Sequence, residues 1–293
     1  MRLSILIPTY NHDCSQLVKD LAQQCKSLYG GAEIVVCDDA SDDKTQRHLF
    51  CGLEQIECVR LLRNKNNMGR ARTLNILADN ARGDYLLIMD ADALVPPEFS
   101  LEVYLEATKI ADVVCGGFRH PDKNPNPLAT LRYKYEREAD KRRSATIRNS
   151  HPYLKMSTFS LVIKREAFMR VRFDENCTEY GYEDTLFGAD LERNNVKVIH
   201  IDNPLIHVGL EKNSVYLEKT NTALRTLRRM ETRMRGHSEL LSVVDKLRKW
   251  HIVWFVRSVY RCCNKPLLRN LLGVNPSLKL FSFYKLGYYL SLQ

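Results

Sequence analysis

The feature that most constrains the fold is an alternation of short apolar runs with helix-like segments through the first 115 residues. The apolar runs predict strands, and runs this continuously hydrophobic are typical of a parallel sheet covered on both faces. The intervening segments have the apolar spacing of helices. This order predicts an α/β fold. The predicted elements are Leu3–Pro8, Cys14–Ser27, Glu33–Cys37, Asp43–Leu53, Cys58–Leu62, Met68–Asn80, Tyr85–Met89, Glu98–Lys109 and Ala111–Cys115.

The pattern becomes less regular after Cys115. A proline-rich loop over Pro121–Pro127 precedes a strongly charged helix over Leu128–Arg143. Strands are predicted over Phe159–Ile163 and Val196–Ile201, and helices over Glu166–Val171 and Asp184–Asn194. Beyond His207 the chain is predicted to be helical and basic.

The C-terminal segment carries all of the net positive charge. Residues 211–293 hold 16 Lys and Arg against 5 Asp and Glu, whereas residues 1–210 hold 28 against 30. Because the larger part is slightly acidic and lacks an aromatic-interleaved recognition motif, we predict no nucleic-acid partner. In the basic segment, large apolar side chains around Trp250–Val256 and Leu280–Tyr289 accompany the cations. This mixture predicts a peripheral membrane contact, and the alternative is packing against the catalytic domain or an oligomer contact.

Cysteine usage and hydropathy bear on the compartment. Nine cysteines occur without a Cys-x-x-Cys pair, which predicts free thiols in a reducing cytoplasm. No run of 18 apolar residues occurs, so no transmembrane helix is predicted. We therefore expect a cytoplasmic protein, held at the inner face of the membrane if the basic segment binds there. The sequence carries no signal for an oligomeric state.

Polar clusters follow three of the predicted strands. They are Thr9-Tyr10-Asn11, Asp38-Asp39 and Asp90-Ala91-Asp92. Since ligands of open α/β sheets bind at the carboxyl ends of the strands, we expect all three clusters to open into one crevice. No Gly-x-Gly-x-x-Gly and no Gly-x-x-x-x-Gly-Lys-Ser/Thr motif occurs, which disfavours a dinucleotide fold and a P-loop ATPase.

Two of these carboxylates are candidates for a metal site. Asp90 and Asp92 are two residues apart after a strand, so both side chains point to the same side and repel each other unless a cation neutralises them. Oxygen ligands suit Mg²⁺ or Mn²⁺, which would also hold a diphosphate. The alternative is a solvated turn. His207 is either a third metal ligand, which would favour Mn²⁺, or an ordinary surface or core histidine.

The remaining acidic clusters have two interpretations each. Asp38 to Asp43 includes a helix cap, and a carboxylate there can also accept hydrogen bonds from a nucleotide base or ribose. Glu183 and Asp184 either stabilise the start of the following helix or supply a general base that takes the proton of an attacking hydroxyl. Residue types alone leave this second choice open.

Taken in order, five segments resemble the motifs of family 2 glycosyltransferases of the GT-A fold. They are Ser4–Asn11, Glu33–Asp43, Asn67–Asn75, Ala81–Asp92 and Tyr180–Asp184. The resemblance runs from Arg2 to about His207. It implies a Rossmann-like, mostly parallel central sheet with helices on both faces, plus a C-terminal helical extension. We therefore expect a catalytic domain over 1–210, with a nucleotide-binding half over about 1–115 and an acceptor-binding half over 116–210. A basic, aromatic-rich helical region follows over 211–293.

The resemblance also implies residue roles. Tyr10 packs on a pyrimidine ring, Asp39 hydrogen-bonds the base, and Arg70 or Arg72 approaches the nucleotide. Asp92 is the favoured direct metal ligand, with Asp90 and His207 beside it. Asp184 is the base and Glu183 positions the acceptor. The implied nucleotide-binding set is Pro8, Thr9, Tyr10, Asp39, Asn67, Arg70, Arg72, Asp90 and Ala91.

The expected function is the transfer of a sugar, with inversion, from a nucleoside-diphosphate donor. We expect this donor to be a UDP-sugar. The expected acceptor is a lipid-linked saccharide, and the transfer would belong to the synthesis of a cell-surface polysaccharide or glycan. One alternative is a nucleotidyltransferase that forms nucleotide sugars, but the N-terminal glycine-rich loop of that class is missing. The other is a non-catalytic protein that binds nucleotide sugars.

Overall fold

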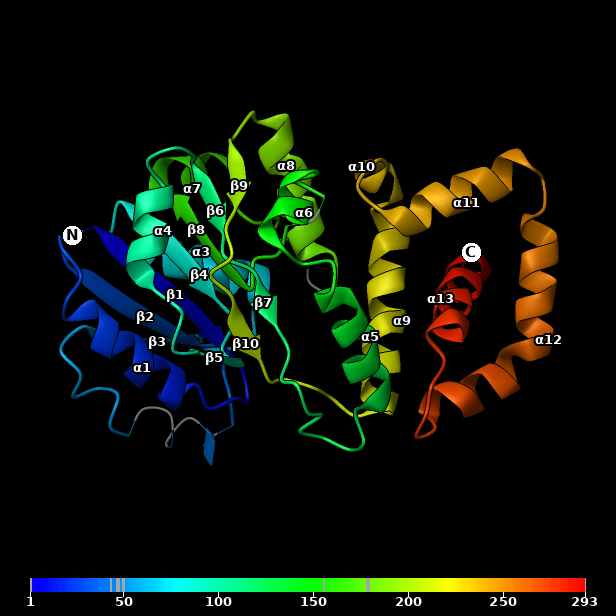
Figure 1. Ribbon diagram of the computed structural model, residues 1–293, viewed down its shortest axis with the longest axis horizontal. Helices are drawn as coiled ribbons and strands as arrows, with labels where there is room; N and C mark the ends of the chain where they lie inside the picture. The colour runs from blue at the N-terminus through cyan, green and yellow to red at the C-terminus, as the bar shows by residue number, and fades with distance from the viewer. Residues whose placement is uncertain are drawn as a thin grey trace.

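The computed structural model describes residues 2–42, 44–45, 48, 51–154, 156–177 and 180–292 (Figure 1). Its strands are β1 (Leu3–Thr9), β2 (Ala32–Asp38), β3 (Val59–Arg63), β4 (Tyr85–Met89), β5 (Ala93–Leu94), β6 (Val113–Cys115), β7 (Phe118–Arg119), β8 (Ser160–Lys164), β9 (Val198–His200) and β10 (Leu205–His207). Its helices up to residue 210 are α1 (Ser15–Cys25), α3 (Arg70–Asn80), α4 (Leu101–Ala107), α5 (Thr130–Asp140), α6 (Ala145–Asn149), α7 (Arg165–Val171) and α8 (Glu183–Arg193). Five of the eleven residues of the helix predicted over Asp43–Leu53 lie outside the described residues, so this prediction is left without a test.

Seven strands form the central sheet in the order β3-β2-β1-β4-β8-β6-β9. The pairs of β1 with β2 and β4, of β2 with β3, and of β6 with β9 are parallel, which confirms the predicted mostly parallel sheet. Strand β8 runs antiparallel to both of its neighbours, β4 and β6. The parallel arrangement brings the carboxyl ends of β1, β2 and β4 to one edge of the sheet.

Helices cover both faces of this sheet, as predicted. Along β1, Leu3, Ile5 and Ile7 point to one face and pack with buried residues of α1 and α4. Leu6 points to the other face, where it packs with α3, α7 and α8. The period-two alternation of a strand therefore divides the buried apolar side chains between two cores.

The structure contains a second sheet that the sequence analysis did not predict. It contains three short strands in the order β5-β10-β7 and lies at the carboxyl-end edge of the central sheet. His207 pairs with Ala93, and Ile206 pairs with both Leu94 and Arg119. This small sheet places the residues after β4 beside the residues around His207.

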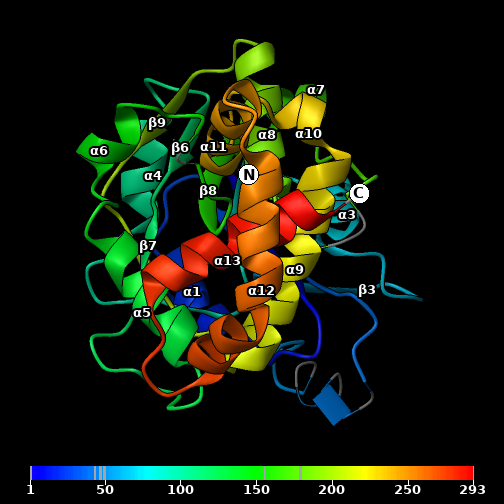
Figure 2. The same ribbon diagram turned by 90° about the vertical axis from the view of Figure 1, so that its right-hand side faces the viewer.

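Five further helices follow: α9 (Asn213–Arg229), α10 (Glu231–Met234), α11 (Glu239–Lys249), α12 (Val253–Leu272) and α13 (Leu278–Ser291). Helix α9 lies between the sheet domain and α11 to α13 (Figures 1 and 2). Its two buried clusters also include residues before 210, Leu186 of α8 in one and Leu131 of α5 in the other, so the segment packs onto the sheet domain. A domain boundary near residue 210 stays a prediction. Among the described helices, none combines the length and hydropathy needed to span a bilayer.

The packing corrects part of the membrane prediction. Phe281, Tyr284 and Tyr289 are only 1%, 3% and 1% exposed, because α13 packs against α9 and α12. Around Leu280–Tyr289 the aromatic side chains are thus largely buried within the protein. Trp250 and Trp254, in contrast, are 63% and 68% exposed.

Glu231 joins four of the C-terminal helices. Its carboxylate accepts hydrogen bonds from Arg248 of α11 at 2.5 Å, from Tyr289 of α13 at 2.7 Å and from Arg228 of α9. The Arg248 hydrogen bond is the largest of the effects that lower the pKa of Glu231 to about 2. A carboxylate bound by two cations and a hydroxyl is a strong link between packed helices.

We predict that Glu231→Gln lowers the free energy of unfolding at pH 7 by about 1–3 kcal/mol, the range for hydrogen bonds to a charged group. Because the folded-state pKa is depressed, this contribution is present above the unfolded pKa and is lost as the pH falls toward about 2. Thermal unfolding of wild type and variant between pH 7 and pH 3 measures the difference, which should shrink on acidification. The control is Glu218→Gln, an exposed carboxylate on α9. An equal effect of both substitutions would contradict the assignment.

Candidate active site

The three predicted polar clusters meet in one cavity of about 680 Å³. Its walls come from the ends of β1, β2 and β4, the start of α3, the loop after β10, and α9. The lining residues include Pro8, Thr9, Tyr10, Asp39, Asn67, Gly69, Arg70, Asp90, Ala91, Asp92, Gly209, Glu211 and Lys219. The structure therefore confirms that the clusters share one crevice, which we call the donor cavity. Tyr10 is 51% exposed, so its ring is free to stack on a ligand.

Asp39 shapes the donor cavity and keeps one position for a ligand. Its carboxylate accepts hydrogen bonds from Asn64 Nδ2 at 2.7 Å and from the backbone N–H groups of Met68 and Gly69, both at 2.9 Å. These bonds hold the loop before α3 against the cavity. Since a carboxylate has about four acceptor positions, one position stays available for a base N–H.

Other carboxylates of the same cluster have structural roles. Asp38 is fully buried, accepts from the backbone N–H of Ser41 and lies 3.5 Å from Arg63. Asp42 accepts from the backbone N–H of Thr45 at 2.8 Å, as expected of a helix cap. The two interpretations of the cluster are thus divided among different residues.

Arg70 lies at the centre of the site. Its Nε and Nη2 donate to Oδ1 of Asp90 at 2.9 and 2.6 Å, and its Nη1 is 3.5 Å from Oδ1 of Asp184. Nη2 also donates to Thr158 Oγ1 at 2.9 Å. Burial by itself would lower the pKa of Arg70, but Asp90 and Asp184 outweigh it and raise that pKa. Burial, followed by the charges of Asp92 and Asp184, raises the pKa of Asp90 despite its partner Arg70.

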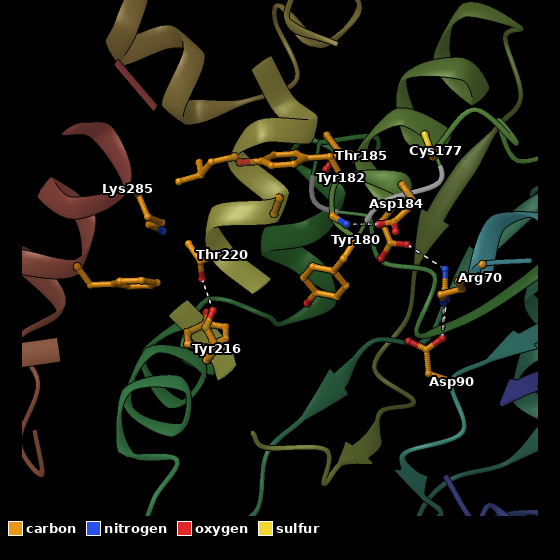
Figure 3. Close-up of a pocket in the computed structure, with 16 residues that line it drawn as sticks. Arg70, Asp90, Cys177, Tyr180, Tyr182, Asp184, Thr185, Tyr216, Thr220 and Lys285 are labelled. Atoms are coloured by element: carbon orange, nitrogen blue, oxygen red, sulfur yellow. Dashed lines mark hydrogen bonds and ion pairs between the residues drawn. The ribbon is translucent and has the colours of Figure 1, made fainter. Parts of the chain in front are cut away.

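A second cavity of about 560 Å³ adjoins the donor cavity (Figure 3). Both cavities are lined by Gly69, Arg70 and Asp90, so they meet at the Arg70 ion pair. The second cavity extends from there toward α9 and α13, with Lys285 at the side away from Arg70. Its walls carry four aromatic rings, from Tyr180, Tyr182, Tyr216 and Phe281.

Asp184 and Glu183 begin α8 and line this second cavity. Asp184 accepts from Ser157 Oγ at 3.2 Å, from Thr158 N–H at 3.1 Å and from Thr158 Oγ1. Glu183 accepts from the backbone N–H of Gly181 at 3.0 Å, and burial, followed by the charge of Asp184, raises the pKa of Glu183. The pair therefore stabilises the start of α8 and faces a ligand cavity at the same time.

Asp92 and His207 form the candidate metal pair. His207 Nε2 is 2.9 Å from Oδ2 of Asp92, although the two residues are 115 positions apart. Burial by itself would raise the pKa of Asp92, but the contact with His207 outweighs it and lowers that pKa. A Cβ on Gly209 would overlap the Asp92 carboxylate, so a larger residue there would displace this carboxylate from its place beside His207. Asp90 faces Arg70 instead, and its role as a metal ligand stays a prediction.

The residues fit a hard divalent cation that binds together with a diphosphate. Within the described part of the chain, no group of three His, Cys, Asp or Glu side chains could hold a metal by itself. Mg²⁺ and Mn²⁺ sites commonly use one or two protein ligands, with phosphate oxygens and water completing the shell. Asp92 and His207 provide such a partial set.

Sequence reasoning missed three charged residues beside the donor cavity. Glu211 forms ion pairs with Lys219 of α9 and Arg132 of α5, and Arg132 Nη2 is 3.5 Å from His207 Nε2. Burial, then the charge of Arg132, lowers the pKa of Lys219. No local motif marks these positions, because tertiary packing alone brings them to the cavity.

The two candidate arginines have different positions. Arg70 lines both cavities, whereas the side chain of Arg72 is 52% exposed and lies 3.6 Å from Glu175. Arg72 is not among the residues that line the donor cavity. This geometry favours Arg70 as the residue that approaches a nucleotide.

The comparisons with known proteins agree with this geometry. The profile of the family described as Glycosyl transferase family 2 matches residues 4–171, more than half of the chain. The chain therefore belongs to this family of glycosyltransferases. It is 30% identical to the glycosyltransferase GlyG of Streptococcus pneumoniae serotype 4 over 123 residues, which cover 42% of this chain and 40% of that protein.

A second relative is the undecaprenyl-phosphate 4-deoxy-4-formamido-L-arabinose transferase of Pseudomonas paraeruginosa. It is 32% identical over 116 residues, which cover 38% of this chain and 34% of that protein. The chain thus spans two fifths or less of the length of the curated relatives it matches here.

Two solved structures share the fold along the whole chain. The mannosyltransferase PcManGT of Pyrobaculum calidifontis, in complex with GDP-Man and Mn²⁺, has a TM-score of 0.60 at 15% identity and covers 99% of this chain and 84% of its own. S. aureus TarS 1–349 has a TM-score of 0.53 at 18% identity and covers 99% and 89%. The fold is therefore the GT-A fold, as predicted.

We predict that Mn²⁺ binds tightly only when UDP is present, because the protein supplies a partial ligand set. Electron paramagnetic resonance of free Mn²⁺ measures its affinity with and without UDP. Asp92→Ala or His207→Ala should weaken the UDP-dependent affinity by about 10–100-fold or more, since even outer-shell partners are worth that much. Asp20→Asn on α1 serves as the control. Tight Mn²⁺ binding without a nucleotide, or unchanged affinity in both site variants, would argue against this pair.

Proposed function

We propose that the protein is an inverting glycosyltransferase that moves a sugar from a nucleoside-diphosphate donor, a UDP-sugar, to a saccharide acceptor. The observation that carries the proposal is the junction of the two cavities at Arg70 and Asp90. The donor cavity holds the candidate base pocket and metal pair, and the second cavity holds Asp184. A sugar bound at the junction would therefore face the donor phosphates on one side and an acceptor on the other.

In this proposal, the residues that line the donor cavity each have a role in binding the donor. Tyr10 stacks on the base, and Asp39 accepts a base N–H at its remaining acceptor position. Asp92 and His207 hold Mn²⁺ or Mg²⁺, which would neutralise charge on the diphosphate when bound. Lys219 and Arg70 supply further positive charge at the cavity wall. Lys219 would exchange Glu211 for a phosphate oxygen as the donor binds.

On the acceptor side, Asp184 acts as the general base. It takes the proton of the attacking hydroxyl while that oxygen bonds to the anomeric carbon and the bond to the diphosphate breaks. One such in-line displacement inverts the anomeric configuration. Ser157 and Thr158 hold the carboxylate in place, and Nη1 of Arg70 lies 3.5 Å from its Oδ1. Glu183 positions the acceptor.

The second cavity suits a saccharide. Its aromatic rings offer flat apolar faces for sugar rings, and Thr185, Thr220 and Lys285 offer hydrogen bonds. Helices α9 and α13 form its outer wall, so the C-terminal region contributes to acceptor binding. A relative acts, by its name, on undecaprenyl phosphate, which supports a lipid-linked acceptor here.

The exposed aromatic corner between α11 and α12 supports membrane contact. Its side chains are Trp250, Ile252, Trp254 and Phe255, which are 63%, 37%, 68% and 55% exposed. Lys249 and Arg257 stand beside them. Tryptophan with basic residues suits the boundary between headgroups and acyl chains, so this corner would bring the enzyme to a lipid-linked acceptor.

The assignment of Asp184 as the general base predicts different effects for two substitutions. Asp184→Asn should keep the affinity for UDP-sugar and lower turnover by about 10²–10⁴-fold, the usual contribution of a general base. Glu183→Gln should mainly raise the KM for the acceptor. Isothermal titration with a UDP-sugar and steady-state kinetics with Mn²⁺ measure both effects. Normal turnover in Asp184→Asn, or product with retained configuration by NMR, would sink the proposal.

The membrane assignment predicts that the protein floats with anionic vesicles containing phosphatidylglycerol at low salt. A Trp250→Ala, Trp254→Ala double variant should stay at the bottom of the gradient. Aromatic side chains that insert into the membrane interface supply most of the affinity for it. Tyr29→Ala removes an aromatic side chain that is 88% exposed on the catalytic domain and should float like wild type. Equal flotation of all three proteins would show that this corner is not the contact.

A further inference from the structure

A line of buried polar side chains leads from the candidate metal pair into the protein. His207 contacts Asp92 through Nε2, and its Nδ1 is 3.0 Å from Nε2 of His120. Nδ1 of His120 is in turn 3.2 Å from Oδ1 of Asp140. His120 is completely buried, and the side chains of Asp140 and His207 are only 12% and 8% exposed. Neither His120 nor Asp140 belongs to the donor cavity or to any motif noted in the sequence.

The second sheet produces this alignment. His207 ends β10 and pairs with Ala93, the residue after Asp92, while the preceding residue of β10 pairs with Arg119, the residue before His120. Asp140 is the last residue of α5 and also accepts the backbone N–H of His120 at 3.1 Å. Three strands and the end of a charged helix therefore converge on one line of hydrogen bonds.

The carboxylate at the buried end of the line favours one arrangement of the ring protons. Burial would raise the pKa of Asp140, but the His120 and Arg143 contacts outweigh it and lower that pKa, so this carboxylate only accepts. In that arrangement His120 donates through Nδ1 to Asp140, a contact of 3.2 Å that is shorter than the 3.4 Å between this nitrogen and Nη1 of Arg143, and it offers the lone pair of Nε2. His207 must then donate through its own Nδ1, which leaves its Nε2 without a proton. That nitrogen lies 2.9 Å from Oδ2 of Asp92 and 3.5 Å from Nη2 of Arg132, so without a metal the guanidinium offsets the repulsion between the two acceptors, and a bound cation would take over that role.

We propose that His120, oriented by Asp140, is a positioning residue that fixes His207 in the tautomer that binds the metal. The inference rests on the proposed function only in taking Asp92 and His207 as the metal pair. A metal-binding histidine commonly donates its other N–H to a carboxylate or carbonyl, which sets the tautomer and strengthens the ligand. Here an imidazole is inserted between the ligand histidine and the carboxylate.

Packing limits the freedom of both rings. The His120 and His207 ring centroids are 5.1 Å apart, and Phe159 stands 5.0 Å from the ring of His207 at 65°. Phe118 stands 5.6 Å from the ring of His120 at 76°. Because these aromatic rings leave the two imidazoles little room to turn, the hydrogen bonds of each imidazole determine its tautomer.

Two substitutions of His120 separate hydrogen bonding from packing. His120→Phe fills the space without an acceptor, and we expect the Mn²⁺ affinity measured with UDP to fall by about 10–100-fold. His120→Gln places an amide oxygen near the former Nε2, where it can accept from His207, so affinity should be largely retained. Long-range ¹H–¹⁵N NMR of the wild type should show the proton of His207 on Nδ1. In His120→Phe this preference should be lost.

His200 supplies the matched control. It is a buried histidine on β9 whose ring contacts Arg148 and the carbonyl of Pro152, away from Asp92. His200→Phe should cost stability without changing Mn²⁺ affinity. If His120→Phe does not fold, Asp140→Asn tests the same line, with the same expected loss of affinity and of the His207 tautomer.

The inference is overturned if His207 carries its proton on Nε2 in the metal-free wild-type protein. It is also overturned if folded His120→Phe binds Mn²⁺ as tightly as wild type. These measurements need only the metal and UDP. A wild-type protein that binds both but transfers no sugar would contradict the proposed function and leave this test intact.

Discussion

The bridge from Arg70 to Asp90 and Asp184 is the interaction on which the rest of the site depends. Its two carboxylates come from different parts of the chain, the end of β4 and the start of α8. Without the guanidinium they would repel each other in a partly buried position. Removing one partner of such a buried group leaves the others uncompensated, which is costly. The junction between the donor cavity and the second cavity therefore depends on these ion pairs as well as on the packing of the chain.

The sequence predicted the parts of the fold that local patterns encode. Continuous apolar runs such as Leu3–Pro8 and Tyr85–Met89 identified strands to within a residue or two. Strands β5, β7 and β10 have two or three residues each, too few for any periodicity to register. Their pairing depends on segments more than 80 residues apart, and the antiparallel direction of β8 likewise has no local signal.

The site shows the same division between local and tertiary information. The resemblance pointed to Asp92, Asp184 and His207, whose roles stay predictions, but it did not indicate that Asp90 would face Arg70. Arg70 and Arg72 were left as alternatives, yet residues two apart on a helix point in different directions, so only one could face the cavity. His120, Arg132 and Lys219 were out of reach, because a lone charged or imidazole side chain gives no sign of its distant partners.

Gly181 has a consequence for how this enzyme can diversify. The family profile ends at residue 171, whereas part of the second cavity belongs to α9 and α13. Gly181 adopts a φ of 108°, and a Cβ on it would overlap Ala223 of α9. On the proposed function, exchanging the C-terminal segment would change the acceptor cavity while the donor cavity keeps most of its lining. Any such exchange must keep a small residue opposite Gly181, so a single point of close backbone contact limits which segments are compatible.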